Sequence, residues 1–146
     1  MSTVSRLASV IVAMATGVVA AAPAEATFPD RNGRIVFVQR DVAATYAEIV
    51  SMTPDGTRFR NLTNHPALDV APSYSPDGRR IAFSSLRSQP PGSGDDRILY
   101  SELYVMDADG SHVRRLTHTF GLLDWQADWS PDGRWLVFAR GPVVMG

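Results

Sequence analysis

Four aspartates that each precede a glycine are the residues of this chain whose type and spacing could do chemistry. A ring of carboxylates at one end of a repeat protein could bind a cation, since hard cations prefer oxygen ligands. The same pairs suit tight turns, where Asp bonds to its own backbone and Gly accepts a positive φ. We favour the turn interpretation because Asp-Gly is what such a turn demands, and a bound cation stays open. The pairs are Asp55-Gly56, Asp77-Gly78, Asp109-Gly110 and Asp132-Gly133.

The remaining polar residues lack the patterns of catalytic, cofactor and metal sites. A calcium loop that starts at Asp107 would need Gly at its sixth position and Glu at its twelfth, but His112 and His118 stand there. These two histidines and His65 do not have the close spacing of metal ligands. The segment Gly92-Ser93-Gly94 is not the Gly-x-Ser-x-Gly motif of serine hydrolases. The chain has no Cys, which excludes thiolate metal sites and cysteine nucleophiles. We therefore predict no catalytic residue, no cofactor and no metal.

Trp125 is the residue that we predict as a possible contact for a binding partner. Tyr74 and Trp129 occupy equivalent places in a sequence repeat, and this equivalence favours packing in the core. Trp125 lies outside the duplicated residues, in a segment that we expect to join two repeats. Connecting segments run over the surface and often carry function.

The elements that must position these residues come from that repeat. Ala71–Phe83 and Gln126–Phe138 are near-copies of one segment, and Glu102–Thr117 resembles Glu48–Thr63 at almost the same interval along the chain. Each near-copy contains Ser-Pro-Asp-Gly, which suits a type I turn because Pro fixes φ and Gly accepts a positive φ. The predicted structural turn residues are Ser75, Pro76, Asp77, Gly78, Ser130, Pro131, Asp132 and Gly133, together with Asp55, Gly56, Asp109 and Gly110.

Each repeat resolves into four short strand candidates. Ile81–Phe83 and Leu103–Met106 are apolar at successive positions, which is typical of strands buried on both faces. A four-stranded antiparallel sheet covered on both faces by like sheets is a propeller blade, whereas a β-sandwich should alternate more cleanly. We predict an all-β fold, a partial β-propeller of four-stranded antiparallel blades. The predicted strands are, in blade order, Pro72–Ser75 and Ala127–Ser130; Arg34–Gln39, Arg80–Ser85 and Trp135–Arg140; Glu48–Thr53 and Glu102–Asp107; and Phe59–Thr63 and Val113–Thr117.

These motifs resemble a known family. Tyr74–Ser85 and Leu103–Ser111, followed by Arg114–Thr117, are similar to the repeat of TolB-type β-propellers, and the resemblance covers nearly all of residues 31–140. It implies a non-enzymatic scaffold that binds a protein or a cell-envelope component, as the periplasmic TolB protein of the Tol–Pal system does. Similar blades also occur in prolyl-oligopeptidase-like peptidases and in some polysaccharide lyases. The alternative is therefore the propeller portion of a secreted hydrolase or lyase whose catalytic part lies elsewhere.

Residues 1–26 have the pattern of a secretory signal peptide. Arg6 precedes the uncharged, largely apolar run Leu7–Ala22, and Ala24-Glu25-Ala26 supplies small residues for cleavage after Ala26. A retained membrane anchor would need a longer apolar run, since a spanning helix has ~20 apolar residues. We expect residues 27–146 to be exported to the periplasm or the outside, without a stable membrane span. The formal net charge of −1 gives no reason to expect a nucleic-acid partner.

The predicted blade units are residues 31–63, 71–117 and 126–140, with three, four and two strands. Closed propellers have about four to eight blades, so we expect a fragment of a longer protein or a degraded, inert gene product. The terminal blades of such a fragment would present apolar faces and open strand edges, which favour aggregation or self-association. The segment Arg87–Ser101 contains Pro90-Pro91-Gly92 and is expected to be a long surface loop.

Overall fold

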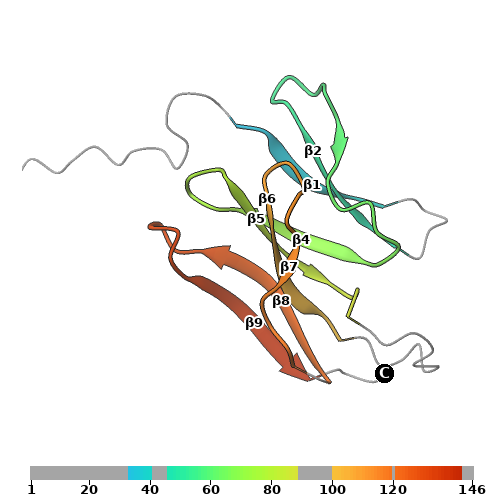
Figure 1. Ribbon diagram of the computed structural model, residues 1–146, viewed down its shortest axis with the longest axis vertical. Coiled ribbons are helices and arrows are strands. Elements are labelled where there is room, and N and C mark those ends of the chain that lie inside the picture. The colour runs from blue at the N-terminus through green and yellow to red at the C-terminus, as the bar shows by residue number, and fades with distance from the viewer. Residues whose placement is uncertain (1–32, 41–45, 89–99, 120, 143–146) are drawn as a thin grey trace, which may run out of the picture.

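Three small antiparallel sheets lie side by side in the structure (Figure 1). The structure, a computed structural model, describes residues 33–40, 46–88, 100–119 and 121–142, and every regular element of more than one residue assigned in these ranges is a β-strand. None of the described segments forms a helix that could cross a membrane. The predicted signal peptide and its cleavage site after Ala26 lie outside the described residues. The strands are β1 (Ile35–Gln39), β2 (Glu48–Met52), β3 (Arg60–Asn61), β4 (Asp69–Tyr74), β5 (Arg80–Ser85), β6 (Glu102–Asp107), β7 (Arg114–Arg115), β8 (Leu122–Trp129) and β9 (Leu136–Pro142).

The predicted all-β fold of partial propeller blades is confirmed. The middle sheet has the order β4-β5-β6-β7, so that each strand pairs with its neighbour in the chain, as in a propeller blade. The strands predicted over Arg80–Ser85 and Glu102–Asp107 have those bounds in the structure and pair along their whole length. The first sheet contains β1, β2 and β3, and the third contains β8 and β9.

The outermost strands β3 and β7 are shorter than the sequence predicts. Arg58 and His112 both have φ of +52°, so the backbone turns sharply just before each strand. After each strand, a threonine hydroxyl replaces a backbone acceptor of the sheet. The amide of Ile49 donates to Thr63 Oγ1, and the amide of Leu103 donates to Thr117 Oγ1, both at 3.0 Å. Side-chain bonds of this kind compete with the regular backbone pairing and end it after a short stretch.

The inner strands β4 and β8 begin earlier than predicted because each contains a β-bulge. The register shifts between Val70 and Ser73 in β4 and between Trp125 and Asp128 in β8. Ala71 and Gln126, which are equivalent in the two near-copies, have φ of +52° and +54° at these bulges. A bulge inserts an unpaired residue and hides the alternation that marks a strand in the sequence. Because β8 begins at Leu122, Trp125 lies within this strand. The prediction that Trp125 lies in a connection between blades is wrong.

Apolar side chains fill the two spaces between neighbouring sheets, and both interfaces use equivalent positions. Phe83, Ile81 and Leu103 have no more than 1% of their surface exposed, and burial of one such side chain stabilises the fold by about 1.5–3 kcal/mol. The first interface packs Val36, Ile49 and Leu62 against Tyr74, Ile81, Phe83, Tyr104 and Met106. The second packs Ala82, Leu103 and Leu116 against Ala127, Trp129, Leu136 and Phe138.

Candidate functional site

The four Asp-Gly turns lie at the same end of the sheets, which we name the turn end. In each turn the glycine amide donates to the carbonyl three residues earlier, and the glycine φ lies between +67° and +93°. The Ser75 hydroxyl donates to Asp77 Oδ1 at 2.6 Å, and the Arg79 amide donates to the same oxygen at 3.1 Å. These bonds, the hydroxyl first, lower the pKa of Asp77. The four carboxylates thus bind their own turns. The described ranges contain no cluster of three His, Cys, Asp or Glu side chains suited to a metal.

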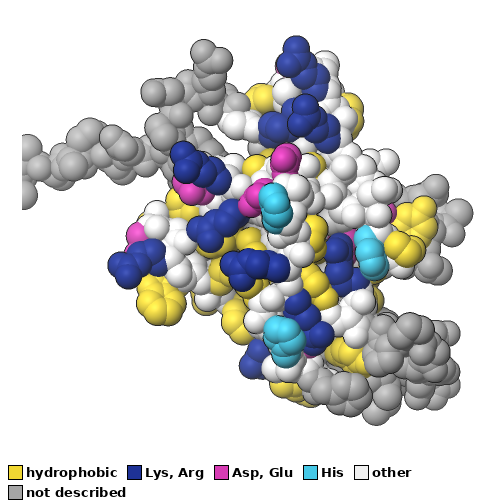
Figure 2. Space-filling view, in the orientation of Figure 1, with side chains coloured by type: hydrophobic (Ala, Val, Ile, Leu, Met, Phe, Trp, Pro, Cys, Tyr) yellow, Lys and Arg dark blue, Asp and Glu magenta, His cyan; other side chains and the backbone are white. Residues whose placement is uncertain are grey.

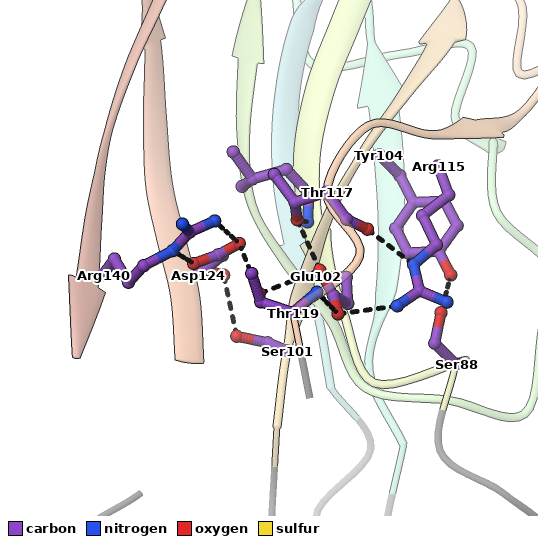
Figure 3. A network of polar contacts seen from close by, with 10 residues as sticks. Ser88, Ser101, Glu102, Tyr104, Arg115, Thr117, Thr119, Asp124 and Arg140 are labelled. Atoms are coloured by element: carbon purple, nitrogen blue, oxygen red, sulfur yellow. Dashed lines mark hydrogen bonds and ion pairs between the residues drawn. The ribbon is translucent and has the colours of Figure 1, made fainter. Parts of the chain in front are cut away.

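Buried acidic side chains at the opposite end form a network that the sequence analysis missed (Figure 3). Glu102 is fully buried. Its carboxylate accepts hydrogen bonds from Arg115 Nη2 at 2.6 Å, Thr117 Oγ1 at 2.5 Å and the Thr119 amide at 2.7 Å. Glu48, its equivalent in the preceding repeat, accepts in the same way from Thr63 Oγ1 at 2.5 Å and from the His65 amide at 3.1 Å. We name this end of the sheets the network end.

A second buried carboxylate joins the network from the next sheet. Asp124 in β8 accepts from Arg140 Nε at 2.6 Å and from Arg140 Nη2 at 2.9 Å. Burial raises the pKa of Asp124, but the hydrogen bonds and the charge of Arg140, with threonine hydroxyls, bring that pKa below its usual value. The matching pair in the preceding blade is Asp69 with Arg87, whose Nη2 lies 2.6 Å from Asp69 Oδ2.

This network joins two neighbouring blades. The Thr119 hydroxyl lies between both carboxylates, at 3.4 Å from Glu102 Oε2 and 3.2 Å from Asp124 Oδ2. The Ser101 hydroxyl donates to the Asp124 carbonyl at 2.7 Å, and the Asp124 amide donates to the Ser101 carbonyl at 2.9 Å. A buried carboxylate that is bonded this fully holds structure together. The signal in the sequence that could have revealed the network is the recurrence, at a nearly constant interval, of Glu48 as Glu102, Thr63 as Thr117 and Asp69 as Asp124.

An apolar cavity of about 240 Å³ opens beside this network and is the candidate binding site. The indole of Trp125 forms one wall of the cavity. Trp125, the predicted contact residue, is half-buried and lies in strand β8. Its ring is held against Gly141 of β9, where an added methyl group would lie 3.1 Å from the ring. None of the predicted turn residues lines the cavity. Its walls come from two neighbouring blades and comprise Leu68, Val70, Leu86, Ser101, Leu123 and Trp125.

Comparison with known proteins supports this architecture. No family model matches the chain. The chain is 29% identical over 139 residues to the Protein TolB homolog of Chlorobium chlorochromatii, with 73% of this chain and 31% of the relative covered. It is 30% identical over 120 residues to Tricorn protease homolog 1 of Streptomyces coelicolor, with 82% of this chain and 10% of that protein covered.

A shorter stretch of 44 residues is 43% identical to the Protein TolB homolog of Chlorobium luteolum, and it covers 30% of this chain and 10% of the relative. The chain spans between 10% and 31% of the length of these three relatives. Together with the stacked antiparallel sheets, these similarities support a TolB-like β-propeller.

Proposed function

We propose that the chain is an exported, non-enzymatic β-propeller scaffold that binds a protein or a cell-envelope component. The observation that carries this proposal is the similarity to a TolB homolog across 73% of the chain, and the stacked antiparallel sheets of this chain agree with the predicted repeat. Binding residues often lie on loops and in apolar cavities that a rigid scaffold positions. The binding residue would be Trp125.

The chemistry of the cavity favours an apolar side chain of a protein partner. Its volume of about 240 Å³ is below the ~300–1,000 Å³ of typical sites for small organic ligands. Five of the six lining residues are apolar, and Trp125 offers the flat face of an indole. Tryptophan is among the residues that contribute most to binding energy at protein interfaces. The ion pair of Asp124 with Arg140 fixes the strands next to this wall.

Export rests on the pattern of residues 1–26. Cleavage after Ala26 would leave residues 27–146. Mass spectrometry of the protein recovered from the periplasm or medium of its native host would show a chain that begins at Thr27. A cytoplasmic protein that keeps Met1–Ala26 would contradict this part of the proposal.

Photo-crosslinking in the native host tests the binding function. A photoreactive phenylalanine replaces Trp125 in the tagged full chain, and the matched control carries the same group at Arg79, an exposed position at the turn end. A discrete adduct with an envelope protein at position 125, absent at position 79 and reduced by Leu68→Asp, is the expected result. Equal labelling at both positions, or none in the exported fraction, would refute binding at the cavity.

A second candidate function rests on the similarity to Tricorn protease homolog 1 alone, of which the chain covers 10%. In this alternative the chain is the propeller portion of a secreted hydrolase, and the catalytic residues lie in another domain. Reading the frame downstream of codon 146 separates the two functions. Further blades followed by a stop codon favour the scaffold, whereas a Gly-x-Ser-x-Gly motif after the blades favours the hydrolase.

A further inference from the structure

The four Asp-Gly pairs of the turn end are prone to isomerisation by their own chemistry. Glycine has no side chain to shield its amide nitrogen, so this nitrogen can attack Cγ of the preceding aspartate when the carboxyl group is protonated. A C–N bond then forms, the C–OH bond breaks, and the hydroxyl leaves as water with the amide proton. Water next opens the resulting succinimide ring, and opening at the α-carbonyl leaves isoaspartate, in which the chain runs through the aspartate side chain.

Each turn occupies the glycine amide that would start this reaction. In all four turns that amide donates to the carbonyl three residues earlier, at 2.8 or 2.9 Å. At Gly78, for example, the acceptor is the carbonyl of Ser75. The nitrogen must break this hydrogen bond before it turns toward the aspartate side chain, so the attack requires the turn to open.

The turn also holds the carboxylate. Asp77 Oδ1 accepts from the Ser75 hydroxyl at 2.6 Å and from the Arg79 amide at 3.1 Å. The other three aspartates accept through Oδ1 in the same way, from the amide two residues later and from a hydroxyl. These bonds, a hydroxyl first, lower the pKa of each carboxyl group, so the protonated form that reacts is rarer at neutral pH. The hydroxyls belong to Thr53 and Thr57 at Asp55, Ser75 at Asp77, Ser111 at Asp109 and Ser130 at Asp132.

All four aspartates are exposed to water, and Figure 2 shows acidic side chains, in magenta, at the surface of the visible face. The bonds that restrain them join residues two or three positions apart, so the turns do not depend on which segments cover the outer sheets. We propose that these four aspartates are modification sites at which isoaspartate forms only when the turn opens, and that the hydroxyl bound to each carboxylate sets how often this happens. This inference does not depend on the proposed function.

Two serine substitutions test the proposal, and each serves as the control of the other. Ser75→Ala removes the hydroxyl bound to Asp77, and Ser130→Ala removes the one bound to Asp132. Ser75→Thr keeps a hydroxyl at the first turn. Each full-length protein is incubated at neutral pH and physiological temperature, and the wild type is also incubated in urea. Peptide mapping by mass spectrometry, with fragmentation that distinguishes isoaspartate from aspartate, gives the rate at each site.

In the wild type all four sites should react more slowly without urea than in urea, because the folded turns must first open. Ser75→Ala should raise the rate at Asp77 by about tenfold, since it removes a hydrogen bond to a charged acceptor, and should leave Asp132 unchanged. Ser130→Ala should do the reverse, and Ser75→Thr should react like the wild type. Equal wild-type rates with and without urea would overturn the proposal. An equal rise at both sites in Ser75→Ala, or no rise in either alanine variant, would also overturn it, because the hydroxyl would then not control its own turn.

Discussion

Replacing Gly110 with alanine should destabilise the fold more than the same change at Gly56. The two glycines occupy equivalent turns, with φ of +93° and +77°. The surroundings differ. A Cβ at Gly56 would meet nothing within 4 Å, whereas a Cβ at Gly110 would lie 2.6 Å from the carbonyl oxygen of Leu62. That oxygen belongs to the backbone of the preceding blade, so it cannot rotate away as a side chain could.

The magnitudes follow from two separate costs. A left-handed backbone costs a residue with a Cβ roughly 1–2 kcal/mol, and both variants carry this cost. Overlap in a packed region costs typically about 1–3 kcal/mol more, and only the Gly110 variant carries it. We therefore expect the free energy of unfolding to fall by about 1–2 kcal/mol for Gly56→Ala and by about 2–5 kcal/mol for Gly110→Ala.

Urea unfolding followed by tryptophan fluorescence measures both losses, at one protein concentration because self-association would add to stability. Thermal melts give a second readout, since each kcal/mol lost from the free energy of unfolding lowers Tm by about 4–8 °C in a domain of up to about 100 residues. Equal losses for the two variants would refute the close approach between the Gly110 turn and Leu62. A loss at Gly56 as large as that predicted for Gly110 would show that φ alone decides the cost.

Three further predictions concern the network and the turns. Glu102→Gln should lower the free energy of unfolding by about 2 kcal/mol, because it removes the charge that Arg115 pairs with; a denaturation midpoint equal to that of the wild type would contradict the role of this pair. The pKa of Asp124 is lowered in the folded state, so its stabilising contribution is full above the unfolded pKa of about 3.9 and is lost as the pH falls through the folded value. An acid titration monitored by circular dichroism should therefore show a shallower loss of stability for Asp124→Asn than for the wild type. Identical pH profiles of the two proteins would count against a stabilising contribution of the Asp124 carboxylate. Gly78→Val should strain a backbone with φ of +67° and expose the middle blade to proteolysis, whereas unchanged protease resistance would argue against the turn.

The local structure was largely predictable because it depends on neighbours in the sequence. The Ser-Pro-Asp-Gly turns follow from the φ preferences of Pro and Gly, and the buried strands follow from unbroken apolar runs such as Leu103–Met106. The repeat then implies that the sheets stack, because one such sheet cannot bury its own apolar faces. The bulges at Ala71 and Gln126 were not predictable, since neither residue type favours a positive φ.

Only the tertiary structure decided which polar residues act together. Glu102 and Asp124 belong to different sheets, yet the hydroxyl of Thr119 contacts both. The place of Trp125 was decided in the same way. The sequence marks it as lying outside the duplicated motif. In the structure Trp125 lies in the bulged strand β8, and its side chain lines a cavity between two blades. Motifs determine local geometry through steric preferences, whereas burial and ion pairing depend on which segments the stacking of the blades brings together.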